Sequence, residues 1–254
     1  MPSSQTYFGK PIKPWKSIKP WKYHDWMGWH EQGDGKLFLG ISVEQGRIKD
    51  VGDVKLKTLV RKLSVDHGLT QILSPTQSLL YKDIPPEMKG TIDSLLAEHG
   101  VKAVETIDPL TRLSMACPAL PTCGLAVTEA ERRMPDFVIK VRAALTKHGL
   151  DQDDIILRMT GCPNGCARPY MAELALVGDG PDMYQIWVGG APDLTRLGKV
   201  YADKVKWVNI DRLLDVLIGQ WKESRFEGEA LGDYCARVGV DNLLPRPRNF
   251  SEVA

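Results

Sequence analysis

Four cysteines in two short-spaced pairs place the strongest constraint on how this chain folds. Cys117 and Cys123 are separated by five residues, and Cys162 and Cys166 by three. Each pair lies in a segment rich in Pro and Gly, which turn the backbone sharply enough to point two sulfurs to the same side. A fold that brings the two segments together would place four thiolates around one metal centre.

Three kinds of site use cysteines at such spacings. Disulfides are disfavoured, because the chain shows no export signal and thiols stay reduced in the cytosol. Structural zinc is an alternative, although its usual Cys-x2-4-Cys knuckles fit a five-residue spacing poorly. A [4Fe-4S] cluster accepts longer and unequal spacings, so iron is the leading interpretation. The fifth cysteine, Cys235, has no cysteine nearby in sequence and is predicted to be a small core residue.

Length and charge exclude several classes of protein. The chain has 254 residues, 43% of them hydrophobic, and can bury a full core without disulfides. Its 33 basic and 32 acidic residues leave a net charge of +1, which gives no general field for binding nucleic acid. The apolar runs are far shorter than the roughly 20 residues that cross a bilayer. We therefore expect neither a nucleic-acid partner nor a membrane.

The segment KPIKPWKSIKPWK at residues 10–22 carries a lysine at every third position and no acidic residue. Polyproline II has three residues per turn, so in that conformation the five ammonium groups share one edge. Two interpretations stay open: a solvated arm that wraps the domain through its apolar edge, or a docking site for an acidic partner. The lysines are Lys10, Lys13, Lys16, Lys19 and Lys22.

The first part of the chain has the pattern of a compact α+β layer. Residues 36–44 are predicted to form a strand and residues 54–66 a helix that ends before Gly68. A hairpin is predicted over residues 71–81, and a second amphipathic helix over residues 87–99.

The cysteines fall in a second part, where helices and strands are mixed. Thr128 starts the pattern TEAE, which predicts a capped helix that restarts at Pro135. A buried strand at residues 155–159 is expected to lead directly into the second cysteine loop. Two further strands and a helix are predicted at 171–177, 184–188 and 211–223. The chain is thus divided into a Lys/Pro/Trp-rich arm (1–35), an α+β layer (36–106) and a cysteine-bearing domain (107–254).

Two long motifs carry a specific resemblance. MTGCPNGCARPYMAE at 159–173 and SMACPALPTCGLAVTEAER at 114–132 resemble the haemoprotein of assimilatory, ferredoxin-dependent sulfite reductases, in the nitrite/sulfite reductase family. Shorter matches are GWHEQGDGKLF, EQGRI and YQIWVGG at 28–38, 44–48 and 184–190. Nitrite reductases share the cysteine spacing, so nitrite is an alternative substrate. The resemblance covers about residues 7–244 and matches only the C-terminal half of the family.

The resemblance implies an α+β fold in which a ferredoxin-like strand-helix layer is followed by a mixed α/β domain that binds a [4Fe-4S] cluster and sirohaem. It also implies the six-electron reduction of sulfite to sulfide, with ferredoxin as donor. Carried onto this sequence, it makes Cys166 a ligand of the cluster and of the sirohaem iron. Cys117, Cys123 and Cys162 would bind the cluster alone.

Sirohaem carries eight carboxylates, so basic side chains should surround it. Arg158 and Arg168 are the local candidates, with ordinary surface ion pairs as the alternative. Asn164 is expected to contact the macrocycle or to be a simple turn residue, and Thr76 and Gln77 are expected near the sirohaem. The family's sulfite-binding Arg and Lys belong to the half that is not matched here, so no catalytic residue is assigned.

Three functions stay open at this point. The first is a sulfite reductase present as its C-terminal half, which would need a further N-terminal half. The second is a non-catalytic [4Fe-4S] electron-transfer module, and the third an inactive fragment. Ferredoxin is the expected partner, docking through the lysines of residues 10–22. We expect a location in the cytoplasm or plastid stroma, because no targeting segment is visible.

Overall fold

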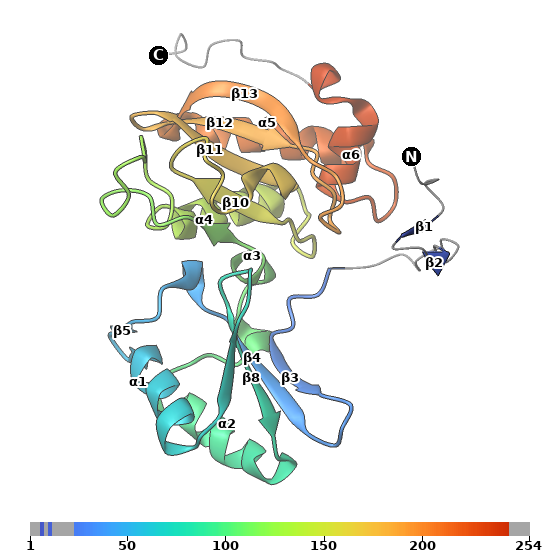
Figure 1. Ribbon diagram of the computed structural model, residues 1–254. Helices are drawn as coiled ribbons and strands as arrows, with labels where there is room; N and C mark the ends of the chain where they lie inside the picture. The colour runs from blue at the N-terminus through green and yellow to red at the C-terminus, as the bar shows by residue number, and fades with distance from the viewer. Residues whose placement is uncertain (1–5, 8–9, 12–22, 244–254) are drawn as a thin grey trace.

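The computed structural model describes residues 6–7, 10–11 and 23–243, and most of these form two lobes (Figure 1). Near the N-terminus, β1 (Thr6–Tyr7) pairs with β2 (Lys10–Pro11) in antiparallel orientation. The other four lysines of the predicted arm, Lys13, Lys16, Lys19 and Lys22, lie outside the described residues. Their common polyproline edge therefore stays a prediction.

The first lobe is built on a four-stranded antiparallel sheet with the order β3-β4-β8-β7. Its strands are β3 (Gly28–Glu31), β4 (Leu37–Ile41), β7 (Thr70–Leu73) and β8 (Leu79–Ile84). A short hairpin of β5 (Asp50–Val51) and β6 (Val54–Lys55) precedes the first helix. The predicted strand and the predicted hairpin are both confirmed.

Two helices pack against this sheet. They are α1 (Leu56–Arg61), which continues as a π-helical turn (Lys62–Asp66), and α2 (Lys89–Glu98). Leu59 and Leu63 from the first helix, Ile92 from α2 and Tyr81 from β8 are fully buried in one core. The apolar residues at helical spacing thus face the sheet, as the sequence predicts.

The second lobe contains a five-stranded sheet with the order β13-β12-β11-β10-β9. Strands β9, β10 and β11 run parallel to one another, whereas β12 is antiparallel to both of its neighbours, β11 and β13. The bounds are β9 (Met115–Ala116), β10 (Leu157–Thr160), β11 (Leu174–Gly180), β12 (Met183–Val188) and β13 (Lys199–Lys206). The predicted strand that leads into the second cysteine loop is confirmed as β10.

The described part of this lobe has four α-helices: α3 (Pro109–Arg112), α4 (Met134–Lys147), α5 (Ile210–Ser224) and α6 (Leu231–Val238). Phe137 and Leu145 of α4 and Leu217 and Trp221 of α5 are fully buried in the second core. Among the described residues, no helix is long and apolar enough to cross a membrane.

The predicted helix start at Thr128 is wrong, because α4 begins only at Met134. Thr128 is buried, and its hydroxyl donates to the Tyr184 hydroxyl at 3.3 Å. Its backbone N–H donates to the carbonyl oxygen of Gly161 at 3.3 Å. The TEAE segment therefore packs against the residues that lead into the second cysteine loop and does not cap a helix.

The division at residue 107 stays a prediction, although the two larger hydrophobic cores of the described residues lie within 39–95 and 110–243. Strand β3, which precedes residue 36, already pairs with β4 in the first sheet.

Candidate metal centre

The parallel pairing of β9 and β10 explains how the two cysteine loops meet. Cys117 directly follows β9, and Cys162 lies two residues after the end of β10. Because adjacent parallel strands end at the same edge of a sheet, both loops start side by side. The Cys117 N–H continues the ladder by donating to the carbonyl oxygen of Met159 at 3.1 Å.

Gly161 joins the two cysteine loops through hydrogen bonds of its N–H and its carbonyl oxygen. Its N–H donates to the Cys117 Sγ at 3.3 Å, and its carbonyl oxygen accepts from the N–H of Val127 at 2.8 Å and that of Thr128. A Cβ added to Gly161 would lie 2.6 Å from the carbonyl oxygen of Thr128 and 2.7 Å from the Cβ of Ala119. Only glycine therefore permits this approach of the two loops.

The four predicted ligands are free thiols with graded exposure. Cys117 and Cys162 are buried, Cys123 is partly buried, and Cys166 is exposed. Burial raises the pKa of the Cys117 thiol, and nearby charge on Cys166 and Cys162 acts in the same direction. The thiols of Cys162 and Cys166 thus both lie within electrostatic reach of Cys117. Cys123 belongs to the same loop as Cys117, where its N–H donates to the carbonyl oxygen of Ala119 at 2.7 Å.

Four thiols are the donor set that a [4Fe-4S] cluster requires. Among the residues that the structure describes, no group of three or more His, Cys, Asp or Glu side chains is arranged to hold a metal ion. A zinc ion lies ~2.3 Å from each thiolate, so its sulfur ligands must lie within about 4 Å of one another. A [4Fe-4S] cube holds its four thiolates further apart, because each binds a different iron.

The tip of the β7–β8 hairpin reaches from the first lobe to β9. The Gln77 Nε2 donates to the carbonyl oxygen of Ala116 at 2.8 Å, and the Ala116 N–H donates to the Gln77 Oε1 at 3.2 Å. The Thr76 hydroxyl is hydrogen-bonded to the Ser74 hydroxyl at 2.9 Å within the same tip. Both predicted sirohaem contacts thus lie in the hairpin that touches β9 just before Cys117.

Two arginines lie beside the same tip. The Arg168 Nη2 donates to the carbonyl oxygen of Pro75 at 2.8 Å. Arg158 is 3% exposed, and its Nη1 donates to the carbonyl oxygens of Leu113 at 2.6 Å and Leu157 at 3.2 Å. The interpretation of Arg158 as a surface ion pair is therefore wrong.

The pKa of Arg158 is lowered to about 10, chiefly by burial and in part by the positive charge of Arg168, while Tyr23 opposes the shift. Neither guanidinium has an ion pair with a carboxylate among the described residues. Two neighbouring cations without a carboxylate suit a group rich in carboxylates. Asn164 is exposed in the turn between Cys162 and Cys166.

Other contacts that support the first cysteine loop were not predicted. The Gln45 Nε2 donates to the Ser114 hydroxyl at 3.1 Å. Arg47 pairs with Glu131 through its Nε at 2.6 Å, and the Glu131 N–H donates to the carbonyl oxygen of Cys117 at 3.1 Å. The only sequence signal for these contacts is the EQGRI motif, which contains Gln45 and Arg47.

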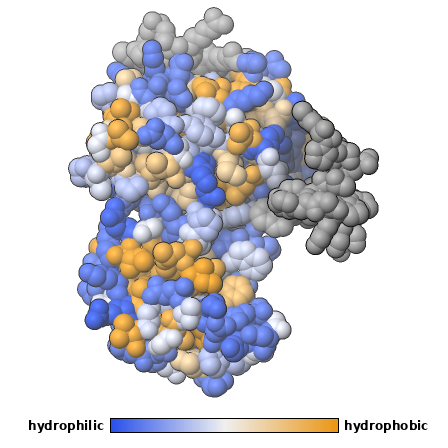
Figure 2. Space-filling model, viewed as in Figure 1, coloured by the Kyte–Doolittle hydropathy of each residue, from blue (hydrophilic) through white to orange (hydrophobic). Residues whose placement is uncertain are grey.

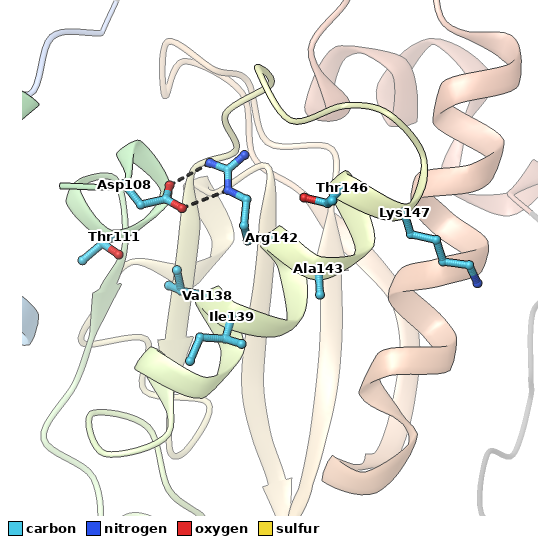
Figure 3. Close-up of a pocket in the computed structure, with 8 residues that line it drawn as sticks. All are labelled: Asp108, Thr111, Val138, Ile139, Arg142, Ala143, Thr146 and Lys147. Carbon is cyan, nitrogen blue, oxygen red and sulfur yellow. Dashed lines mark hydrogen bonds and ion pairs between the residues drawn. The ribbon is translucent and has the colours of Figure 1, made fainter. Parts of the chain in front are cut away.

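A hollow of about 720 Å³ lies between α3 and α4 (Figure 3). Its charged side chains are largely engaged, since Arg142 donates to both carboxylate oxygens of Asp108 at 2.7 and 2.9 Å. None of its lining residues belongs to either cysteine loop.

Comparison with known proteins identifies relatives of this chain. No family model matches the chain. The sulfite reductase (ferredoxin) of Synechococcus elongatus is 48% identical over 248 residues, which are 98% of this chain and 39% of that protein. The sulfite reductase (NADPH) hemoprotein beta-component of Alteromonas mediterranea is 43% identical over 216 residues, covering 85% of this chain and 38% of that protein. The chain therefore spans about two fifths of the length of these curated relatives.

Two solved structures share the fold. The Mycobacterium tuberculosis NirA protein matches with a TM-score of 0.69 at 23% identity, over 92% of this chain and 43% of that chain. Dissimilatory sulfite reductase I matches with a TM-score of 0.55 at 12% identity, over 86% of this chain and 72% of that chain. They confirm the predicted α+β fold class. With the sulfite reductases among its relatives, the chain belongs to the nitrite/sulfite reductase family.

Proposed function

We propose that this chain is the C-terminal part of a ferredoxin-dependent sulfite reductase and holds a [4Fe-4S] cluster against sirohaem. One observation carries the proposal: both cysteine loops follow adjacent parallel strands, β9 and β10, at the same edge of the sheet, and Gly161 hydrogen-bonds to both loops' neighbouring backbone and to the Cys117 sulfur. The identity to a ferredoxin-dependent sulfite reductase over 98% of the chain supports the substrate and the donor.

Cys117, Cys123, Cys162 and Cys166 would hold the cluster. Cys166 is the exposed member of the set, so its sulfur is the one best placed to reach a second group as well. When bound, the cluster and the haem store electrons that arrive singly and offer an iron to which sulfur can bind. The Gly161 N–H stabilises negative charge on the Cys117 sulfur.

The residues around the hairpin tip would receive the haem. Arg158 and Arg168 supply positive charge for its carboxylates, since neither is already paired with one among the described residues. Thr76 and Gln77 lie on the same tip, and Asn164 is exposed between the two cysteines that follow β10. We assign these three to the wall of the sirohaem site.

The groups that hold and protonate sulfite are proposed to lie in the remainder of a longer protein, because the relatives are more than twice as long. The first lobe shows an apolar patch that such a partner half would cover (Figure 2). The exposed large apolar residues in this part of the chain include Val51, Val54, Val65, Ile72 and Leu73. Ferredoxin would dock through the lysines of residues 10–22, in the cytoplasm or plastid stroma.

The proposal is tested by purifying the chain without oxygen, supplying iron, sulfide and sirohaem, and recording absorption spectra. We expect a Soret band in addition to cluster absorption. Cys166→Ser should lose both signals, whereas Cys235→Ser should keep both, because Cys235 is fully buried in the core. A cluster without haem would instead support an electron-transfer module, and zinc without iron would refute both functions.

A further inference from the structure

Tyr170 spans the loop that carries Cys162 and Cys166. It lies in a 3-10 turn (Pro169–Met171) just after Arg168. Its hydroxyl donates to the carbonyl oxygen of Pro163 at 2.6 Å. Tyr170, which follows Cys166, is thus hydrogen-bonded to Pro163, the residue directly after Cys162.

The Tyr170 ring is itself held in place by packing. It lies edge-on against the ring of Trp187 in β12, with 4.6 Å between the ring centroids and 64° between the planes. A Cβ added to Gly165 would lie 2.8 Å from the Tyr170 Cε2, so the ring also covers the loop at Gly165. The Tyr170 carbonyl oxygen accepts from the N–H of Gly198 at 2.7 Å, which fixes the backbone from the other side.

Little else holds this loop. Pro163 and Asn164 are exposed, and the Arg168 N–H donates to the carbonyl oxygen of Gly165 at 2.8 Å. Among residues 23–243, no other side chain donates to the backbone of residues 163–165. The loop conformation between the two thiols therefore depends on Tyr170 more than on any other side chain.

We propose that Tyr170 is a positioning residue for the cluster, which holds the loop so that Cys162 and Cys166 keep the geometry the cluster requires. The inference rests on the proposed function, because it concerns how this chain retains a [4Fe-4S] cluster. Some groups do not bind the metal themselves but hold its ligands in orientation. Removing such a group typically lowers metal affinity by about 10- to 100-fold.

The experiment compares Tyr170→Phe with Tyr81→Phe as a matched control. The Tyr81 hydroxyl also donates to a backbone carbonyl oxygen, that of Val60 at 3.2 Å, but in the core of the first lobe. Both variants thus lose one tyrosine hydroxyl, and only one of them loses it at the cysteine loop. The readout is the rate at which a chelator removes iron from the reconstituted protein without oxygen, together with the thermal midpoint of the metal-free chain.

For Tyr170→Phe we expect iron loss about tenfold faster than in the wild type, with little change in the thermal midpoint. Tyr81→Phe should lose iron at the wild-type rate. Trp187→Leu keeps the hydroxyl but removes the ring that supports Tyr170, so it should also lose iron faster than Tyr81→Phe.

Two results would overturn the inference and can be told apart. Equal rates in the wild type, Tyr170→Phe and Tyr81→Phe would refute the role of Tyr170 while the proposed function stands. A wild-type chain that takes up no cluster would refute the proposed function and the inference together.

Discussion

Replacing Gly161 with alanine tests how the two cysteine loops are joined. The new methyl group would lie 2.6 Å from the carbonyl oxygen of Thr128, 2.7 Å from the Cβ of Ala119 and 3.1 Å from the Cβ of Ala126. The first two contacts are far too short, so the first loop must move away. Forcing an extra methyl into a packed site costs typically 1–3 kcal/mol.

The displaced loop would also lose hydrogen bonds. The Gly161 carbonyl oxygen accepts from the N–H groups of Val127 and Thr128, and each such bond contributes about 1 kcal/mol. We therefore expect Gly161→Ala to lower the free energy of unfolding by about 3–5 kcal/mol. That is a large share of the roughly 5–15 kcal/mol of a typical domain.

Gly124→Ala provides the control for this experiment. Gly124 lies in the first cysteine loop, and a Cβ there would meet no atom within 4 Å. Its effect on the free energy of unfolding should stay within about 1 kcal/mol, and iron uptake should match that of the wild type. Urea unfolding of the metal-free variants measures both values. If Gly161→Ala unfolded like the wild type, or if both variants were weakened equally, the role of Gly161 in joining the two loops would be refuted.

Three further predictions concern charge. Burial raises the pKa of Glu173 from 4.5 to about 7, so the native state binds the extra proton between these values. The free energy of unfolding should fall by roughly 3 kcal/mol as the pH rises from 4.5 through 7. In Glu173→Gln, the free energy of unfolding measured with urea should depend less on pH over this range. Arg168→Gln should weaken sirohaem uptake, measured by the Soret band. The free energy of unfolding of the metal-free chain should change by no more than about 1 kcal/mol. Undiminished sirohaem uptake would show that Arg168 is not part of the site. Replacing Lys13 and Lys16 with Glu should weaken ferredoxin binding and make the affinity depend less on salt concentration, as measured by titration calorimetry. An unchanged affinity would favour the alternative interpretation, in which the arm is a solvated segment.

The four candidate thiols could be named from the sequence because the determinants of that prediction are local. Cysteine spacing, with Pro and Gly between the thiols, identifies Cys117, Cys123, Cys162 and Cys166 as a set. The apolar run before Cys162 predicts the strand that positions it, and the structure confirms that strand as β10.

Contacts between distant segments could not be predicted in this way. Gln77 binds Ala116, which is 39 residues away, and nothing in either local pattern indicates that pair. The TEAE motif at Thr128 satisfies the local rule for a helix start. In the structure, however, the Thr128 N–H donates to the carbonyl oxygen of Gly161, a contact with a distant segment that the local rule does not include. Hydrophobic periodicity also says nothing about a buried cation, so Arg158 could not be placed from its sequence alone.

Strand β13 and helix α6 were not predicted, for a different reason. Residues of β13 alternate in exposed and buried pairs, and its pairing with β12 contains register shifts, so the period of two is lost. Helix α6 is only eight residues long, which gives too few turns for a clear apolar stripe.

The iron and acid-labile sulfide content of the chain tests the central claim most directly. After anaerobic reconstitution, the wild type should hold about four iron and four sulfide per chain, as a [4Fe-4S] cluster requires. Changing any of the four cysteines to serine should lower both numbers together, whereas Cys235→Ser should not. A wild-type chain with one zinc and no sulfide, or one whose iron content is unaffected by Cys117→Ser and Cys162→Ser, would contradict the account.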